Sequence, residues 1–491
     1  MRRLPLAALV LLFSIALHSQ PVFPTIFPPE EYAARRAQVF AQIGDGVAIL
    51  QATTERPGEQ AFRQANQFFY LCGVQESRAI LVLDGRTHRA TIYLMPLEPR
   101  DVASKFGPGL LEPGDAAMKA TGLDAVLPRP QFATDLALFA TDHRILYTPF
   151  RPEVLGESSS YDTVLLDKLN HQDPWDGRDS REQVFRAKLA AALDKAAPDG
   201  AATSNLAAGK AIRDLDPIID ALRAIKSPRE IAILREASRI TMLGIERAMH
   251  NTHPGVFEYQ LQADAEYIFK KYGSFGPSYF ALVATGPNTW YTHYHRNTAQ
   301  LEAGQLVQLD DAPDYKYYSS DLSRIFPVDG HFTKQQLERY SLYLNMYQIL
   351  LHSIAPHLTP NQILAKAVPQ MDAALAAHTF HDDATRTAFQ KFVDGFHKQL
   401  AANSPHAMLG HSVGMEVHDQ YSVFPPYTTL EPGAVFTIEP MIRFEDDHTG
   451  LRIEDMLLIT PDGVDNMSAD LPEEPAAIEK LMHSPLPADL R

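Results

Sequence analysis

One stretch of the chain decides how its second half folds: residues 305–328 read QLVQLDDAPDYKYYSSDLSRIFPV. Apolar and polar side chains alternate over residues 305–309, and a second apolar run follows Asp321. The turn between the runs is rich in Asp, Pro and Tyr, so the pattern predicts a hairpin with Asp310 and Asp321 near its ends. Cross-strand neighbours lie about 5 Å apart. The two carboxylates could therefore hold one ion, although aspartates beside a turn are more often simply hydrated.

A histidine lies between two glycines further along the chain. The segment reads Gly410-His411-Ser412-Val413-Gly414, and His418 follows seven residues after His411. An isolated histidine is usually structural or exposed. Flanking glycines allow the backbone to approach another group closely, and they raise the chance of a binding role only modestly.

Acidic residues also interrupt two apolar segments that are predicted to be strands. Glu439 ends the run 434–439, and Glu454 lies inside residues 450–459 beside Arg452. A buried glutamate is costly unless it is paired or bound to a metal. Arg452 could pair with one of these acids, or both acids could face water on edge strands.

Taken together, two aspartates, two glutamates and one histidine form an oxygen-rich set of metal-binding side chains. Such a set suits hard or borderline divalent ions, manganese first and then cobalt, zinc or iron. Four carboxylates bring four negative charges, which two divalent ions would neutralise. We therefore expect two metal ions, with Mn²⁺ as the first choice.

Composition excludes several classes of protein. The chain has 491 residues, of which 45% are hydrophobic and 21% charged, which is typical of a globular protein of two or three domains. One cysteine, Cys72, rules out a disulfide framework and lies in an apolar string that predicts burial. A formal charge of −16 would repel phosphate backbones, so we do not expect a nucleic-acid partner.

The N-terminus resembles a secretory signal peptide over residues 1–19. Arg2 and Arg3 precede an apolar run over residues 4–17. A membrane anchor is the alternative, but the run is shorter than the ~20 residues needed to span a bilayer. We expect export, periplasmic or secreted, without a stable membrane anchor.

The rest of the chain divides into two expected domains, 28–215 and 216–485. The first mixes a helix at 30–43 with buried strands at 47–50, 78–83 and 90–95, followed by helices and loops; residues 157–180 are predicted to be largely loop. It offers no dense cluster of catalytic residue types.

The second domain has a clear helix start. In Ser227-Pro228-Arg229-Glu230, serine caps the helix, proline takes its first position and glutamate completes a capping box. Apolar residues at three- and four-residue steps then predict one buried stripe up to Ala248. Strands are expected after Gly276, helices between 334 and 400, strands over 434–460 and a short helix at 477–483.

These motifs, in this order, resemble the pita-bread metallopeptidases, and residues 30–482 are similar to the aminopeptidase P family. In the first domain, residues 62–73 resemble that family's signature stretch, which argues against the methionine aminopeptidases. The matching segments of the second domain are 224–228, 286–294, 320–324, 410–411, 417–419, 437–440 and 452–455.

The resemblance implies an α/β N-terminal domain and an α+β pita-bread catalytic domain, a curved antiparallel sheet backed by helices with the metals in its concavity. It also implies a homo-oligomer that cleaves peptides with proline in second position. The metal ligands carried over are Asp310, Asp321, His411, Glu439 and Glu454. His293 and His418 would face the substrate, and Arg452 would pair with the acids of the site.

The implied reaction is hydrolysis by water whose pKa two metal ions lower. Glu439 would act as acid and base, His418 would stabilise charge on the carbonyl oxygen, and His293 would help hold the residue after the cut bond. The bond to proline has no N–H, so selectivity should come from a shaped apolar pocket.

Three positions depart from the family pattern. Asp311 follows the first ligand where the family has alanine, Met441 follows the glutamate–proline pair in place of glycine, and Ala407 replaces a histidine found in many relatives. Two alternatives stay open. One is a prolidase restricted to Xaa-Pro dipeptides, and the other is a metal-free pita-bread module that binds peptides.

Overall fold

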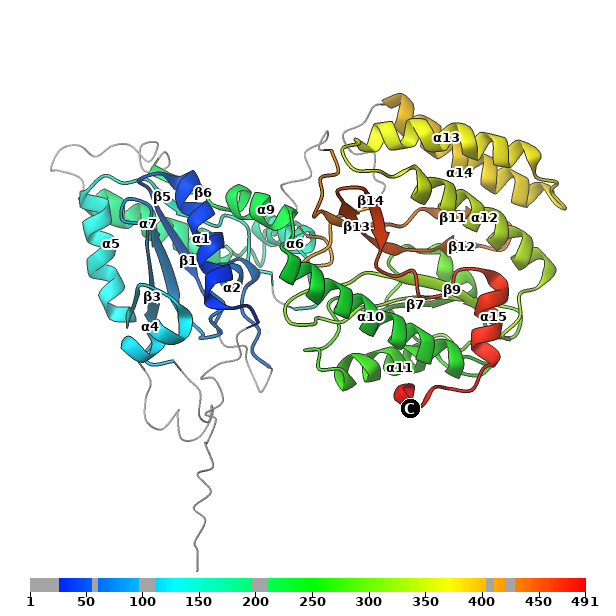
Figure 1. Ribbon diagram of the computed structural model, residues 1–491, viewed down its shortest axis with the longest axis horizontal. Helices are drawn as coiled ribbons and strands as arrows, with labels where there is room; N and C mark the ends of the chain where they lie inside the picture. The colour runs from blue at the N-terminus through cyan, green and yellow to red at the C-terminus, as the bar shows by residue number, and fades with distance from the viewer. Residues whose placement is uncertain are drawn as a thin grey trace, which may run out of the picture.

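The computed structural model shows two lobes side by side (Figure 1). It describes residues 26–54, 61–96, 111–154, 156–196, 211–402, 410–419 and 429–491. The predicted signal peptide, 1–19, and Ala407 lie outside these residues. Among the helices that are described, none is both long enough and apolar enough to cross a membrane.

The first lobe is built on a mixed sheet of six strands in the order β4-β3-β2-β1-β5-β6. The central pairs β1–β2 and β2–β3 are antiparallel, and the outer pairs are parallel. The strands are β1 (Val47–Gln51), β2 (Ile80–Asp84), β3 (Arg89–Leu94), β4 (Ala125–Pro128), β5 (Leu146–Thr148) and β6 (Ile212–Asp214). The helices are α1 (Pro29–Ile43), α2 (Asn66–Cys72), α4 (Asp115–Thr121), α5 (Phe132–Thr141), α6 (Ser160–Gln172) and α7 (Arg181–Ala196). This confirms the predicted α/β class, and Cys72 is buried.

The prediction that residues 157–180 are largely loop is wrong for α6. Ser159 caps this helix by accepting a hydrogen bond from the Asp162 backbone N–H at 3.3 Å. Leu165, Leu166 and Leu169 remain exposed, so α6 has no buried apolar stripe. The sequence of α6 therefore lacks the periodic buried apolar residues that would indicate a helix, and the N-cap residue Ser159 was the remaining signal.

The second lobe contains small antiparallel sheets that together form the curved pita-bread sheet. They have the orders β7-β8-β9, β10-β13-β14 and β11-β12. The bridges Ser323–Glu454 and Ser412–Phe436 connect segments far apart in the chain. The strands are β7 (Leu282–Thr285), β8 (Leu306–Asp310), β9 (Ser323–Pro327), β10 (Val435–Ile438), β11 (Met441–Phe444), β12 (Thr449–Arg452), β13 (Asp455–Thr460) and β14 (Gly463–Asn466). The single strand expected over 450–459 is thus two strands, with Glu454 between them.

Helices flank these strands in the view of Figure 1, with α10 and α11 below and α13 and α14 above. The helices of this half are α9 (Asp216–Ala224), α10 (Pro228–Asn251), α11 (Glu258–Lys271), α12 (Lys334–Ser353), α13 (Pro360–Ala377), α14 (Asp383–Ala402) and α15 (Pro475–His483). The predicted capping box is present, because Glu230 accepts from the Ser227 N–H at 2.8 Å. Leu234, Ala237 and Ile240 begin the predicted buried stripe.

The signature stretch 62–73 of the first lobe packs against the second lobe. Phe69 stacks on Tyr317 with ring centroids 3.7 Å apart, and Arg63 pairs with Asp314 in the same turn. Asn66 donates to Glu416 Oε1 at 3.2 Å. The first lobe therefore supports both the turn between Asp310 and Asp321 and the segment that carries His411 and His418.

Candidate metal centre

The hairpin brings Asp310 and Asp321 together. Asp310 ends β8 opposite Ser323 of β9, and Asp321 lies two residues before that strand. The Tyr279 hydroxyl oxygen lies 2.7 Å from Oδ1 of both aspartates. A hydroxyl has one proton to donate, so one of these contacts joins two acceptors unless one of the acids is protonated.

His411 reaches the same place from a different segment. A Cβ atom on Gly410 would clash with the Thr437 carbonyl, so this glycine allows the close approach that the sequence suggested. His411 Nε2 lies 3.3 Å from both Asp321 Oδ2 and Glu439 Oε1. Nδ1 lies 3.3 Å from the Ser412 carbonyl, which is an acceptor. Burial opposes protonation of the ring, but the two acids hold the pKa of His411 well above its usual value, so both ring nitrogens carry protons in the metal-free site, and the proton on Nε2 must leave before that nitrogen can bind a metal.

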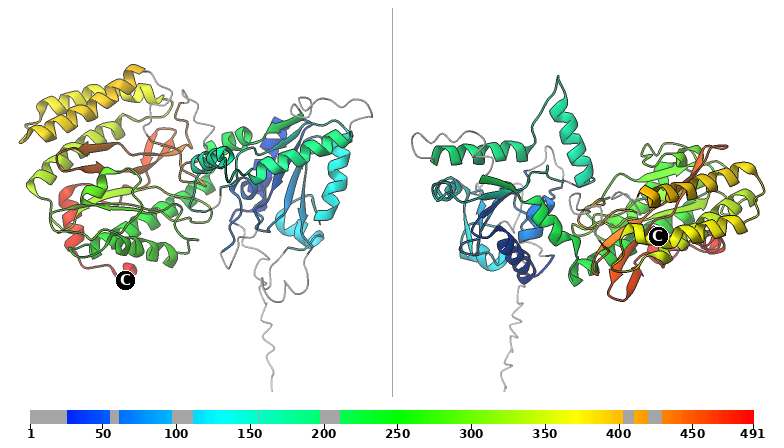
Figure 2. Two further views of the ribbon diagram at one scale, coloured as in Figure 1. Left: turned by 180° about the vertical axis from the view of Figure 1, so that it is seen from behind. Right: turned by 90° about the horizontal axis from the view of Figure 1, so that it is seen from above.

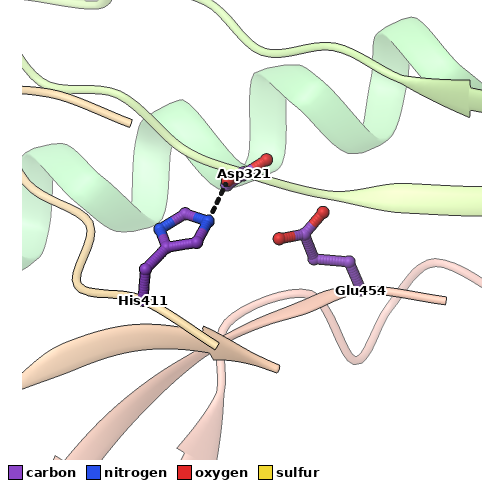
Figure 3. Close-up of side chains that lie close together, drawn as sticks. All are labelled: Asp321, His411 and Glu454. Carbon is purple, nitrogen blue, oxygen red and sulfur yellow. Dashed lines mark ion pairs between the residues drawn. The ribbon is translucent and has the colours of Figure 1, made fainter. Parts of the chain in front are cut away.

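Glu454 completes a compact group with Asp321 and His411. One ligand atom from each of these three lies within 4.8 Å of the others, and Figure 3 shows the side chains converging from separate elements. Ser323 donates to Glu454 Oε2 at 2.9 Å. Glu454 Oε1 is buried and has no hydrogen-bond partner among the described residues. An acceptor buried without a partner is costly, and a cation would satisfy it.

Arg452 is the cation that the fold itself supplies. It is buried, pairs with Asp310 Oδ2, and lies 3.6 Å from Glu439 Oε2. It also donates to the Thr292 carbonyl at 3.1 Å. The structure thus brings all five carried-over ligand positions and Arg452 into one connected cluster.

The charges of this cluster are not balanced. Burial and the neighbouring acids raise the pKa of Asp310 to about 6 despite Arg452, and they hold the pKa of Glu454 well above its usual value. Four carboxylates face one buried arginine and one imidazole. The donor set, its orphaned oxygen and its uncompensated charge fit divalent metal ions.

Two further histidines lie beside the cluster. The His418 and His411 rings are T-shaped with centroids 4.1 Å apart, and burial with His411 lowers the pKa of His418 to about 4. His293 is exposed at the rim, where partial burial and Arg452 lower its pKa. Both rings are therefore neutral near pH 7 and can donate a hydrogen bond.

Three further residues lie near the centre, and two of them, Tyr279 and Tyr161, carry no signal in the sequence. Tyr279 bridges the two aspartates from a loop, and Tyr161 of the first lobe lies against His418 with ring centroids 6.4 Å apart. Asp311, which departs from the family pattern, is fully buried, and its carboxylate oxygens have no partner among the described residues. Burial, with Glu266 and Asp310, raises its pKa well above the usual value.

A cleft of about 390 Å³ opens beside Glu439. Its apolar lining includes Leu350, Phe392, Phe396, Pro440 and Met441. Met441, the second departure, therefore occupies a wall of this cleft, where a glycine would leave more room.

A curved antiparallel sheet with this carboxylate and imidazole cluster defines a metallopeptidase of the pita-bread class. Residues 232–461 match the metallopeptidase family M24, and residues 32–147 match the N-terminal domain of aminopeptidase P. The chain belongs to the M24 metallopeptidases and has the two-domain architecture of aminopeptidase P.

Individual relatives agree with this assignment. The Xaa-Pro aminopeptidase of Escherichia coli (strain K12) is 28% identical over 478 residues, which cover 92% of this chain and 97% of the relative. Xaa-Pro aminopeptidase 3 of Homo sapiens is 28% identical, covering 86% of this chain and 76% of its own.

Solved structures lead to the same family. Proline aminopeptidase P II from Yersinia pestis has a TM-score of 0.70 at 27% identity, covering 93% of this chain and 99% of its own. Zinc-substituted Escherichia coli aminopeptidase P in complex with product has a TM-score of 0.68 at 27% identity, covering 93% and 98%.

Proposed function

We propose that this chain is a metal-dependent aminopeptidase that releases the N-terminal residue from peptides with proline in second position. One observation carries the proposal: ligand atoms of Asp321, His411 and Glu454 lie within 4.8 Å of one another, and the buried Oε1 of Glu454 has no hydrogen-bond partner among the described residues. The match of residues 32–147 to the N-terminal domain of aminopeptidase P supports the aminopeptidase over the prolidase, and the retention of all five ligand types at matched positions argues against the metal-free module.

Asp310, Asp321, His411, Glu439 and Glu454 would hold two divalent ions, and we propose Mn²⁺ because the donors are mostly carboxylate oxygens. Bound ions would supply a water of lowered pKa and polarise the scissile carbonyl. Arg452, buried between Asp310 and Glu439, would keep these acids in place and offset part of their charge.

Glu439 is the residue best suited to move protons. Burial opposes its ionisation, but His411 and Arg452 hold its pKa at about 2, so it is a carboxylate at neutral pH. It also lines the cleft. It can accept the proton of the attacking water and deliver it to the proline nitrogen as that bond breaks.

The neutral His418 ring can donate a hydrogen bond to the carbonyl oxygen as negative charge develops there. His293 can do the same for the carbonyl of the proline residue. The apolar cleft supports the remaining recognition, because a proline nitrogen offers no N–H and must be selected by shape.

A panel of Xaa-Pro-Xaa tripeptides and Xaa-Pro dipeptides tests the proposal, assayed with manganese, cobalt, zinc and no metal after exhaustive chelation. We expect metal-dependent release of the first residue from tripeptides. Full activity in the chelated enzyme would refute the metal mechanism. Cleavage of dipeptides alone would favour the prolidase. A protein that neither binds metal nor hydrolyses any of the peptides would favour the binding module.

Export through residues 1–19 and assembly into a homo-oligomer stay predictions. Cell fractionation of the full chain tests the first, and light scattering of the purified protein tests the second.

A further inference from the structure

The first lobe sends the N-terminal end of α6 to the candidate metal centre. The Ser160 backbone N–H donates to Glu416 Oε2 at 2.8 Å, and its hydroxyl donates to the same oxygen. Glu416 is buried and lies two residues before His418. Figures 1 and 2 show α6 at the junction of the lobes. This contact fixes residues 160–162 next to the catalytic segment.

Tyr161 faces the histidines from this position. Its ring is T-shaped to His418 at 86°, and His418 in turn stands over the candidate ligand His411. The Tyr161 side chain remains 49% exposed. Tyr161 therefore presents an exposed ring face, and the His418 ring lies between it and the candidate ligand His411.

Asp162 carries negative charge to the same side of the site. The Ser159 hydroxyl donates to Asp162 Oδ2 at 2.6 Å, which orients the carboxylate. Its charge acts to raise the pKa of both His293 and His418, rings that come from separate segments of the second lobe. Asp162 directly follows Tyr161 in the first turn of α6, and Tyr161 contacts His418, so the charge of Asp162 lies at the same border of the site and acts on both histidines.

We propose that Tyr161 and Asp162 form a specificity wall that contacts the substrate immediately after its proline. This wall disfavours a free carboxylate on that proline and favours peptides of three or more residues, above all those with lysine or arginine in third position. The inference rests on the proposed function and assigns its selectivity to the first lobe.

The reason is electrostatic. In an Xaa-Pro dipeptide the proline bears the terminal carboxylate, whereas in a longer peptide it bears a neutral amide. A nearby like charge in a partly hydrated cleft changes relative rates by about three- to tenfold, which corresponds to about 0.7–1.4 kcal/mol. Arg452 cannot offset this effect, because it is buried and paired with Asp310.

A structural role for Asp162 is the competing explanation. An acid in the first turn stabilises a helix through its dipole. Loss of that stabilisation would alter the rates for all substrates alike, whereas loss of the specificity wall changes their ratio.

Asp162→Asn in the full-length, metal-reconstituted protein separates these explanations, because it removes the charge and keeps the size. The readout is kcat/KM for Ala-Pro, Ala-Pro-Ala, Ala-Pro-Lys and Ala-Pro-Glu at low and high salt. We expect the Ala-Pro to Ala-Pro-Ala ratio to rise about three- to tenfold and the Lys over Glu preference to fall by a similar factor. High salt should produce part of both changes in the wild type.

Asp176→Asn is the matched control, since it removes an exposed charge beyond the far end of α6. Its two ratios should equal those of the wild type. Tyr161→Ala should raise KM for the tripeptides several-fold more than for Ala-Pro, and Tyr161→Phe should restore the wild-type values.

Unchanged ratios in Asp162→Asn, with an active wild type, would overturn this inference and leave the proposed function standing. A uniform fall for all four peptides would do the same and assign Asp162 a structural role. A wild type that cleaves none of the peptides with any metal would refute the proposed function and this inference with it.

Discussion

Two buried ionic clusters lie within the second lobe and its border, and they are balanced very differently. At the border, two cations, Arg223 and Lys226, face two carboxylates, Glu416 and Asp419. Arg223 lies 3.0 Å from Glu416 and pairs with Asp419, and Lys226 Nζ lies 3.6 Å from Asp419 Oδ2. At the metal centre, four carboxylates face Arg452 and one imidazole.

Two adjacent residues show the same contrast at the smallest scale. Asp455 receives hydrogen bonds from Arg324, Tyr347 and Ser468, each at 2.7 Å, and these offset the burial of its carboxylate so that its pKa is lowered. Glu454, one residue earlier, has a raised pKa and an oxygen without a partner among the described residues. A balanced cluster holds the fold together, whereas an unbalanced one needs an external cation. The predictions below test this distinction.

Replacing Glu454 with alanine should produce the largest effect. It removes the most poorly compensated carboxylate and a proposed ligand, so we expect kcat/KM on Xaa-Pro-Xaa peptides to fall by at least about 10³-fold, with reduced metal content. Asp462→Ala, an exposed acid in the turn after β13, is the control. A Glu454→Ala variant with normal metal content and activity would remove the basis of the comparison.

Arg223→Leu tests the balanced cluster. It leaves Glu416 and Asp419 without their main partner, so the free energy of unfolding should fall by about 3–5 kcal/mol. Bound metal per folded molecule should not change. Arg235→Leu, an exposed partner of Asp465, should cost less than about 1 kcal/mol. Thermal unfolding and metal analysis of both variants would show whether the two arginines differ in their contribution to stability. Equal losses of unfolding free energy would count against the distinction between balanced and unbalanced clusters.

Metal addition should stabilise the protein, by about 2.7 kcal/mol for each bound ion at a hundredfold excess over its Kd. The size of this effect should depend on pH. In the metal-free protein the pKa of Asp310 is raised to about 6. The protonated Asp310 side chain therefore stabilises the fold below the unfolded-state pKa of about 4, and this contribution is lost as the pH rises through about 6. Metal binding requires the carboxylates ionised. The gap in Tm between loaded and chelated protein should therefore widen from pH 4.5 to 7, and a constant gap would contradict the assignment.

Asp311 is a buried acid that belongs to neither cluster, and the expected effect of its replacement is the smallest. Asp311→Ala should stabilise the protein by about 1 kcal/mol at pH 8, because it removes a buried carboxyl without a hydrogen-bond partner among the described residues, partly offset by the cavity it leaves. The raised pKa of Asp311 means that its acid form fits the fold, so the gain should shrink toward pH 5. Urea unfolding at the two pH values measures it; destabilisation at pH 8 would show that Asp311 has a supporting role.

Much of the fold was predictable because its signals are local. The capping box at Ser227, the hairpin that joins Asp310 to Asp321, and the glycine before His411 each depend on a few neighbouring residues and on known turn and helix chemistry. The helix α6 was not, because its leucines face solvent and leave no periodic burial to detect.

The sequence alone determined which side chains could bind metal, the order of the motifs and the class of each domain, since spacing and residue type carry that information along the chain. Tertiary structure decided which charges are neutralised and which are not: that Arg452 pairs with Asp310, that Glu454 keeps an oxygen without a partner among the described residues, and that Tyr161 and Asp162 arrive from the other lobe. Those facts depend on distances between residues far apart in sequence, and a Coulomb or hydrogen-bond energy exists only once folding has set those distances.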